Sequence, residues 1–110
     1  MTVASVWKNE TVKRIMVEGH SKYAEYGYDI VCSSISTAMI LSANLICKLT
    51  ENCNVNINEE KVIIDIAINE NEIVNDLNKD AVYKRLETLL ETLEDIHSQY
   101  PKYLKIRYFG

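Results

Sequence analysis

Apolar and polar positions alternate along several short runs of the chain. Two such runs, Val3–Trp7 and Val12–Val17, are separated by the polar stretch Lys8–Thr11. Paired runs of this kind predict a β-hairpin. Two further β-rich runs, Val55–Ile57 and Lys61–Ile68, are joined by three polar residues and predict a second hairpin.

Two longer segments have helical patterns instead. After Asp29 the apolar residues continue to about Leu49 on more than one helical face, which is typical of a central helix or of one shared with a second subunit. A second helix is predicted over Asp80–Tyr100, where one apolar stripe lies beneath a charged face and Pro101 follows. The final residues, Leu104–Phe109, alternate apolar and basic and predict a closing strand.

This order of elements indicates the fold class. Strand pairs that are each followed by one helix predict a two-layer α+β domain, with an antiparallel or mixed sheet and both helices packed on one face. The chain has 110 residues, so residues 1–110 are expected to form a single domain. With 47% apolar and 25% charged residues, the composition is that of an ordered globular protein.

The net charge and the hydropathy pattern limit the classes of binding partner that we expect. A formal net charge of −4 repels phosphate backbones and anionic lipid surfaces, so neither nucleic acid nor membrane is an expected partner. The longest apolar stretch, Ile35–Leu49, is interrupted by polar residues, and no basic leader precedes an apolar run at the N-terminus. We therefore expect a cytoplasmic protein.

The cysteines raise the first chemical question. Cys32, Cys47 and Cys53 form an odd set with no CxxC pair and no histidine at zinc-finger spacing, so neither a disulfide framework nor a metal site is expected. Free thiols in a reducing compartment are predicted, with Cys47 buried in the helix and Cys53 exposed. No cofactor is implied. The question is which thiol reacts.

Cys32 lies where a thiolate is favoured. The segment between Glu18 and Asp29 follows neither periodicity and predicts a loop, and Asp29 is a suitable N-cap for the helix after it. Cys32 then occupies the third helical position, in the first turn. Free amides and the positive end of the helix dipole stabilise an anion there.

A thiol nucleophile also needs a base that accepts the thiol proton and later protonates a leaving amine. Imidazole suits both steps. His20, twelve residues before Cys32, follows Gly19 at the end of the second predicted strand, where the loop can return it to the start of the helix. His97 lies on the flank of the second helix, where a surface role is expected.

The segment between these residues carries a more specific signal. It reads Gly-His-Ser-Lys-Tyr-Ala-Glu-Tyr-Gly-Tyr-Asp-Ile-Val-Cys-Ser-Ser-Ile-Ser from Gly19 to Ser36. It resembles, without a gap, the signature of the bacterial ribosomal-processing cysteine proteases, the Prp family. In that family a Gly-His pair precedes a glycine-containing loop and an Asp-Ile-Val-Cys helix start.

The resemblance implies a function and a site. It implies a cysteine endopeptidase that removes an N-terminal extension from the precursor of large-subunit ribosomal protein twenty-seven, with Cys32 as nucleophile and His20 as base. It also implies a homodimer and a mobile loop over the site, here Ser21–Tyr28, with Gly27 as a pivot. Ser21, Ser33 and Ser34 replace small apolar residues that are usual in the family, which affects the shape of the site more than its chemistry.

Several residues near the dyad have two interpretations. Asp29 either orients His20 or only caps the helix. Ser36, four residues after Cys32, either hydrogen-bonds within the site or bonds back to the helix. Backbone amides of Cys32 and Ser33 are candidates for an oxyanion hole. The tyrosines of the loop either contact an apolar substrate side chain or pack the loop: Tyr23, Tyr26 and Tyr28.

Two other functions remain open from the residues. The chain is alternatively a non-catalytic module of the same fold that binds a ribosomal protein. A third interpretation is a redox-sensing protein with Cys32 as the sensor thiol.

Overall fold

The computed structural model describes most of the chain. The described residues are 2–19, 26–50, 55–58, 63–69, 73 and 75–110, with side chains described from Val31 onward in the first helix. The elements are β1 Thr2–Asn9, β2 Thr11–Glu18, α1 Tyr26–Cys47, β3 Val55–Asn58, β4 Ile63–Ala67, α2 Asp76–Gln99 and β5 Leu104–Phe109.

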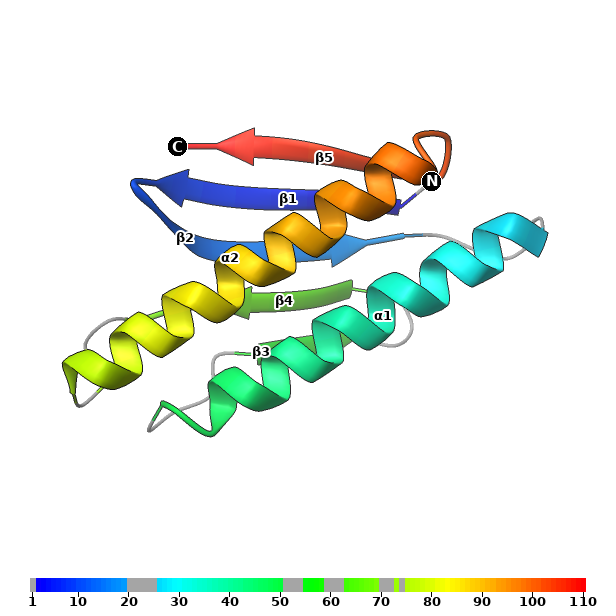
Figure 1. Cartoon of the computed structure of the whole chain (residues 1–110). Coiled ribbons are helices and arrows are strands. Elements are labelled where there is room, and N and C mark those ends of the chain that lie inside the picture. The colour runs from blue at the N-terminus through cyan, green and yellow to red at the C-terminus, as the bar shows by residue number, and fades with distance from the viewer. Residues whose placement is uncertain (1, 20–25, 51–54, 59–62, 70–72, 74) are drawn as a thin grey trace.

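The strands form one mixed sheet in the order β3-β4-β2-β1-β5. β5 runs parallel to β1, and the other neighbouring pairs are antiparallel. Both helices lie on the same face of this sheet (Figure 1). The predicted two-layer α+β class is confirmed, and the sheet is the mixed alternative of the two that the sequence allowed.

The first hairpin is tighter than its polar stretch suggested. β1 and β2 extend through the polar residues until only Glu10 separates them. Glu10 takes a positive φ of 62°, in the left-handed region that lets the chain reverse within so few residues. The register shifts between Trp7 and Lys8, which marks a bulge just before the turn.

The core lies between the sheet and the helices. Residues at alternate positions of β1 and β2 point to the helices, and Ala4, Val6 and Ile15 among them are completely buried. α2 contributes the predicted leucine stripe, and α1 contributes residues at helical spacing. The buried residues of the two helices are Val31, Ile35, Met39, Ala43, Ile46, Val82, Leu86, Leu89, Leu90 and Leu93.

Both helices begin earlier than predicted. α2 starts at Asp76, because the Asn75 side-chain oxygen accepts a 2.8 Å hydrogen bond from the Asn78 amide and caps the helix. α1 starts at Tyr26, so the placement of Asp29 at the N-cap was wrong. No helix in the described part of the chain is long and apolar enough to cross a membrane.

The prediction of a free thiol at Cys47 was also wrong. Cys47, the last residue of α1, is disulfide-bonded. An odd cysteine count and the absence of a CxxC pair do not exclude a single bond between two thiols that the fold brings close together. Cys53 lies outside the described residues. Cys32 is a free cysteine.

Candidate active site

Cys32 lies in the second turn of α1, as its seventh residue. Its neighbours Val31 and Ile35 are almost completely buried against the sheet, whereas Ser33 and Ser34 are exposed. Cys32 is half-buried between these two environments. The thiol is therefore at the margin of the core, where contact with a substrate does not require the core to open.

A small pocket surrounds this thiol. Its volume is about 30 Å³, roughly the space of one water molecule. It is lined by residues of β1, β2, α1 and β4 and by the residue after β2: Thr2, Val17, Cys32, Ile35, Ser36, Ile64 and Gly19. Residues of four elements thus meet at this pocket.

Thr2 was not found by the sequence analysis. Its Oγ1 lies 3.5 Å from Cys32 Sγ, and the residue is only 3% exposed. It is at the start of β1, on the side that faces α1. A threonine in a predicted strand has no distinguishing pattern, and its contact with residue 32 depends on how the helix packs.

Two predicted supporting residues lie at the thiol. Gly19 follows β2, and Ser36 lies one turn beyond Cys32 on α1, and both line the same pocket. The spacing of four residues thus places Ser36 in the same pocket as Cys32. No hydrogen bond links the Ser36 hydroxyl to Cys32 among the described contacts.

Other predicted residues lie at or beyond the limit of the described structure. His20 and Tyr23 are outside the described residues. Tyr26, Gly27 and Tyr28 lie in the first turn of α1, so the prediction of a loop as far as Tyr28 was wrong, and the role of Gly27 as a pivot stays a prediction. The loop was predicted as far as Asp29 because the segment follows neither periodicity and Asp29 is a suitable N-cap.

The earlier helix start changes the environment of Cys32. The free amides of a helix are its first four, which in α1 belong to residues 26–29. From the fifth residue onward each amide bonds to the carbonyl four residues earlier, and this includes the amides of Cys32 and Ser33. The prediction that placed Cys32 in the first turn was wrong.

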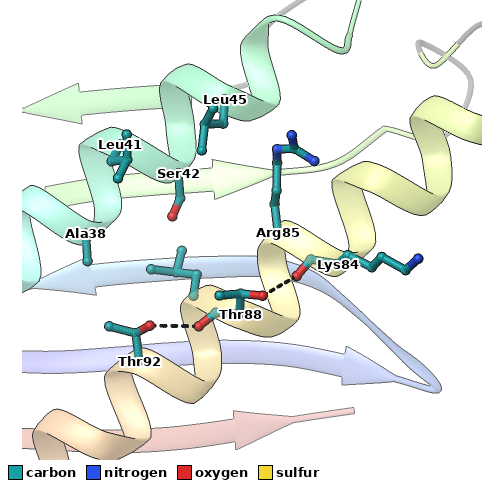
Figure 2. Close-up of a pocket in the computed structure, with 9 residues that line it drawn as sticks. Ala38, Leu41, Ser42, Leu45, Lys84, Arg85, Thr88 and Thr92 are labelled. Carbon is teal, nitrogen blue, oxygen red and sulfur yellow. Dashed lines mark hydrogen bonds between the residues drawn. The ribbon is translucent and has the colours of Figure 1, made fainter.

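A second, larger cavity lies between the helices. It has a volume of about 400 Å³ and is lined by Ala38, Leu41, Ser42, Leu45, Lys84, Arg85, Thr88, Leu89 and Thr92. Arg85 rises from α2 into the space between the helices (Figure 2). Its Nη1 donates to the Ala81 carbonyl, while its buried Nε has no hydrogen-bond partner among the described residues. We call this cavity the interhelical groove. Cys32 does not line it.

Comparison with known proteins connects the thiol pocket to an enzyme class. The model of the family described as cysteine protease Prp matches residues 1–105. The chain belongs to this family. It is a cysteine protease, and its fold is that of solved Prp structures.

Relatives of known sequence and structure support the same family assignment. The ribosomal processing cysteine protease Prp of Staphylococcus aureus is 30% identical over 98 residues, covering 88% of this chain and 87% of that protein. A crystal structure of S. aureus Prp with a substrate peptide is similar with a TM-score of 0.80 and 27% identity, covering 98% of this chain and 99% of that one. A second, with a covalently linked product peptide, has a TM-score of 0.77 and 28% identity over the same shares.

Proposed function

We propose that this Prp protease removes an N-terminal extension from the precursor of large-subunit ribosomal protein twenty-seven, with Cys32 as nucleophile and His20 as base. The observation that carries the proposal is the position of Cys32, a free thiol in a pocket at the margin of the core. The names of the S. aureus relatives, a ribosomal processing protease and its substrate-peptide complex, support this substrate class. The proposal places the enzyme in the cytoplasm, where ribosomes assemble.

The proposed reaction has two steps. Cys32 Sγ attacks the scissile carbonyl carbon as a thiolate, the electron pair of the C=O bond moves to oxygen, and the C–N bond breaks as protonated His20 gives its proton to the leaving amine. Water then attacks the thioester while His20 accepts its proton, and the C–S bond breaks. The thiolate is regenerated, and no cofactor takes part.

The oxyanion needs donors that the helix does not already use. Amides of Cys32 and Ser33 remain the proposed donors, but the bounds of α1 commit both to helical hydrogen bonds. Substrate binding must therefore release them by shortening α1 at its N-terminal end. In such a conformation Asp29 returns to the helix start, where it either caps the helix or orients His20. The tyrosines at positions 23, 26 and 28 are the proposed contacts for an apolar substrate side chain.

Cleavage of a synthetic peptide tests this function. A peptide that spans the precursor's extension and its junction is incubated with wild type, Cys32→Ala and His20→Ala, and the products are identified by mass spectrometry. We expect one cut at the junction by wild type and a loss of at least about 1,000-fold in rate for both variants. Cleavage that persists in Cys32→Ala contradicts the nucleophile assignment. Binding of the peptide without cleavage by all three proteins favours the alternative, a non-catalytic ribosomal-protein-binding module.

We also propose that the enzyme acts as a homodimer and that the interhelical groove is its interface. Leu41 at the groove is 59% exposed and Ile40 beside it is 42% exposed, which leaves apolar surface uncovered on α1. A second copy that packs on the groove covers this apolar surface.

Sedimentation of matched leucine variants tests the interface. Leu41→Lys adds a charge inside the groove, and Leu77→Lys adds the same charge at an 84% exposed leucine outside it. We expect wild type and Leu77→Lys to sediment as dimers and Leu41→Lys as a monomer. A monomeric wild type at micromolar concentration contradicts the dimer, and a dimeric Leu41→Lys contradicts the interface.

A further inference from the structure

The hydroxyl of Thr2 is held against the sulfur of Cys32 by the architecture of the sheet. The Oγ1–Sγ distance is 3.5 Å, and the two residues are separated by 30 positions in sequence. Thr2 is 3% exposed, so bulk water does not compete freely for its hydroxyl. Strand formation does not require a buried hydroxyl in contact with a thiol, so the position of this hydroxyl needs another explanation.

The backbone around Thr2 fixes this hydroxyl. The Thr2 amide donates a 3.1 Å hydrogen bond to the Tyr103 carbonyl, just before β5, and Thr2 is the register partner of Leu104 in the parallel pair. A β-branched side chain also has restricted χ1 freedom in a strand. The backbone position of Thr2 is therefore set by β1 and β5.

The surroundings of the sulfur are otherwise largely apolar. Val17, Ile35 and Ile64 line the pocket, and their side chains offer the sulfur no hydrogen bond. A hydroxyl suits both forms of the cysteine, because it accepts from the S–H group of the thiol and donates to the anion. Thr2 thus offers the thiolate a fixed donor where hydrophobic side chains offer none.

We propose that Thr2 is a positioning residue of the protease, which orients Cys32 Sγ for attack and stabilises its thiolate through the Oγ1 hydrogen bond. The inference rests on the proposed role of Cys32 as nucleophile. Thr2 acts through the sulfur and does not exchange protons with the substrate. Thr37, an exposed threonine of α1 that does not line the pocket, is the matched comparison.

Site-resolved alkylation of the folded protein tests the inference without any substrate. Wild type, Thr2→Val, Thr2→Ala, Thr2→Ser and Thr37→Val are treated with iodoacetamide at one pH, and modification of the peptide containing Cys32 is followed by mass spectrometry. We expect Thr2→Val and Thr2→Ala to slow alkylation about tenfold, the factor of one hydrogen bond to a charged group. Thr2→Ser restores the rate to within about twofold, and Thr37→Val leaves it within the same range.

Peptide cleavage by the same variants distinguishes positioning from packing. Thr2→Val matches threonine in shape, so we expect kcat to fall about tenfold with KM unchanged, and Thr2→Ser to recover kcat. Urea denaturation checks that each variant is folded. If Thr2→Val does not fold, Thr2→Ala provides a second protein without the hydroxyl.

Two results overturn the inference. One is an alkylation rate and a kcat equal to those of wild type in a folded variant that lacks the Thr2 hydroxyl. The other is failure of Thr2→Ser to recover what Thr2→Val loses, which indicates a packing role. Cleavage that survives in Cys32→Ala instead contradicts the proposed function, and the alkylation series still reports on the contact between Thr2 and Cys32.

Discussion

The two helices cover the same face of the sheet but differ in what they present to the outside. α2 carries charged residues in nearly every turn and buries one leucine stripe. α1, in contrast, has Asp29 as its one charged residue between Tyr26 and Cys47, and it exposes large apolar residues in its second half. Charged outer faces suit contact with water, whereas an uncharged and partly apolar outer face suits contact with another protein.

From this difference we expect α2 to contribute mainly to stability and α1 to contribute also to function. α2 completes the core, and its polar contacts attach β5: His97 Nδ1 donates to the Leu104 carbonyl at 2.6 Å, and the Tyr108 hydroxyl donates to Glu94. α1 also contributes to the core, but it carries Cys32 on one flank and the interhelical groove on the other. Substitutions in the two helices should therefore have separable effects.

The largest expected contrast is between Leu93→Ala in α2 and Cys32→Ala in α1. Leu93 is completely buried, so its truncation should lower the free energy of unfolding by about 3 kcal/mol and leave kcat of the folded enzyme unchanged. Cys32→Ala should do the reverse, with a nearly unchanged urea midpoint and no detectable cleavage. If Leu93→Ala abolishes cleavage while it is still folded, α2 is not merely structural.

A smaller effect is expected for His97→Ala. Loss of the half-buried hydrogen bond to the Leu104 carbonyl should lower the free energy of unfolding by about 1 kcal/mol. Since His97 attaches β5 and does not line the thiol pocket, cleavage of the precursor peptide should stay within about twofold of wild type. A greater loss of cleavage in the folded variant would make His97 a competitor of His20 for the role of base.

The smallest expected effect concerns the other contact between α2 and β5. Burial raises the pKa of Tyr108 above its ordinary value, and the hydrogen bond to Glu94 and its charge act in the same direction. A raised pKa in the folded state means stability that is present below pH 10 and is lost as pH rises through the tyrosine pKa in the folded protein.

Urea denaturation of wild type and Tyr108→Phe at pH 8 and above pH 10 measures this loss. The stability advantage of wild type should shrink at the higher pH, by a few tenths of a kcal/mol at most, because Tyr108 is largely exposed and water screens the charge. An advantage that grows with pH contradicts the sign of the pKa shift.

The sequence predicted the elements with strong periodicity. Leu104–Phe109 was located to the residue, and the leucine stripe of α2 matches the buried residues Leu86, Leu89, Leu90 and Leu93. The start of α1 was missed because a glycine inside a helix costs roughly 1 kcal/mol, so Gly27 favoured a loop. Packing of α1 on the sheet outweighs that local preference.

Contacts between distant residues were beyond prediction from one chain. The parallel pairing of β5 with β1 joins the two ends of the sequence, and no local pattern encodes it. Thr2 meets Cys32 only because β1 and α1 face each other across the core. Ser36 and Gly19, by contrast, were found because one is a helical turn from Cys32 and the other belongs to the Gly-His pair.

Capture of the acyl-enzyme tests the central claim most directly. Wild-type protease is mixed with the precursor peptide, quenched in acid within the first turnover, digested and analysed by mass spectrometry. The account predicts a thioester between the sulfur of Cys32 and the N-terminal product, absent in Cys32→Ala. An adduct on another residue, or cleavage by Cys32→Ala at the wild-type rate, would contradict it.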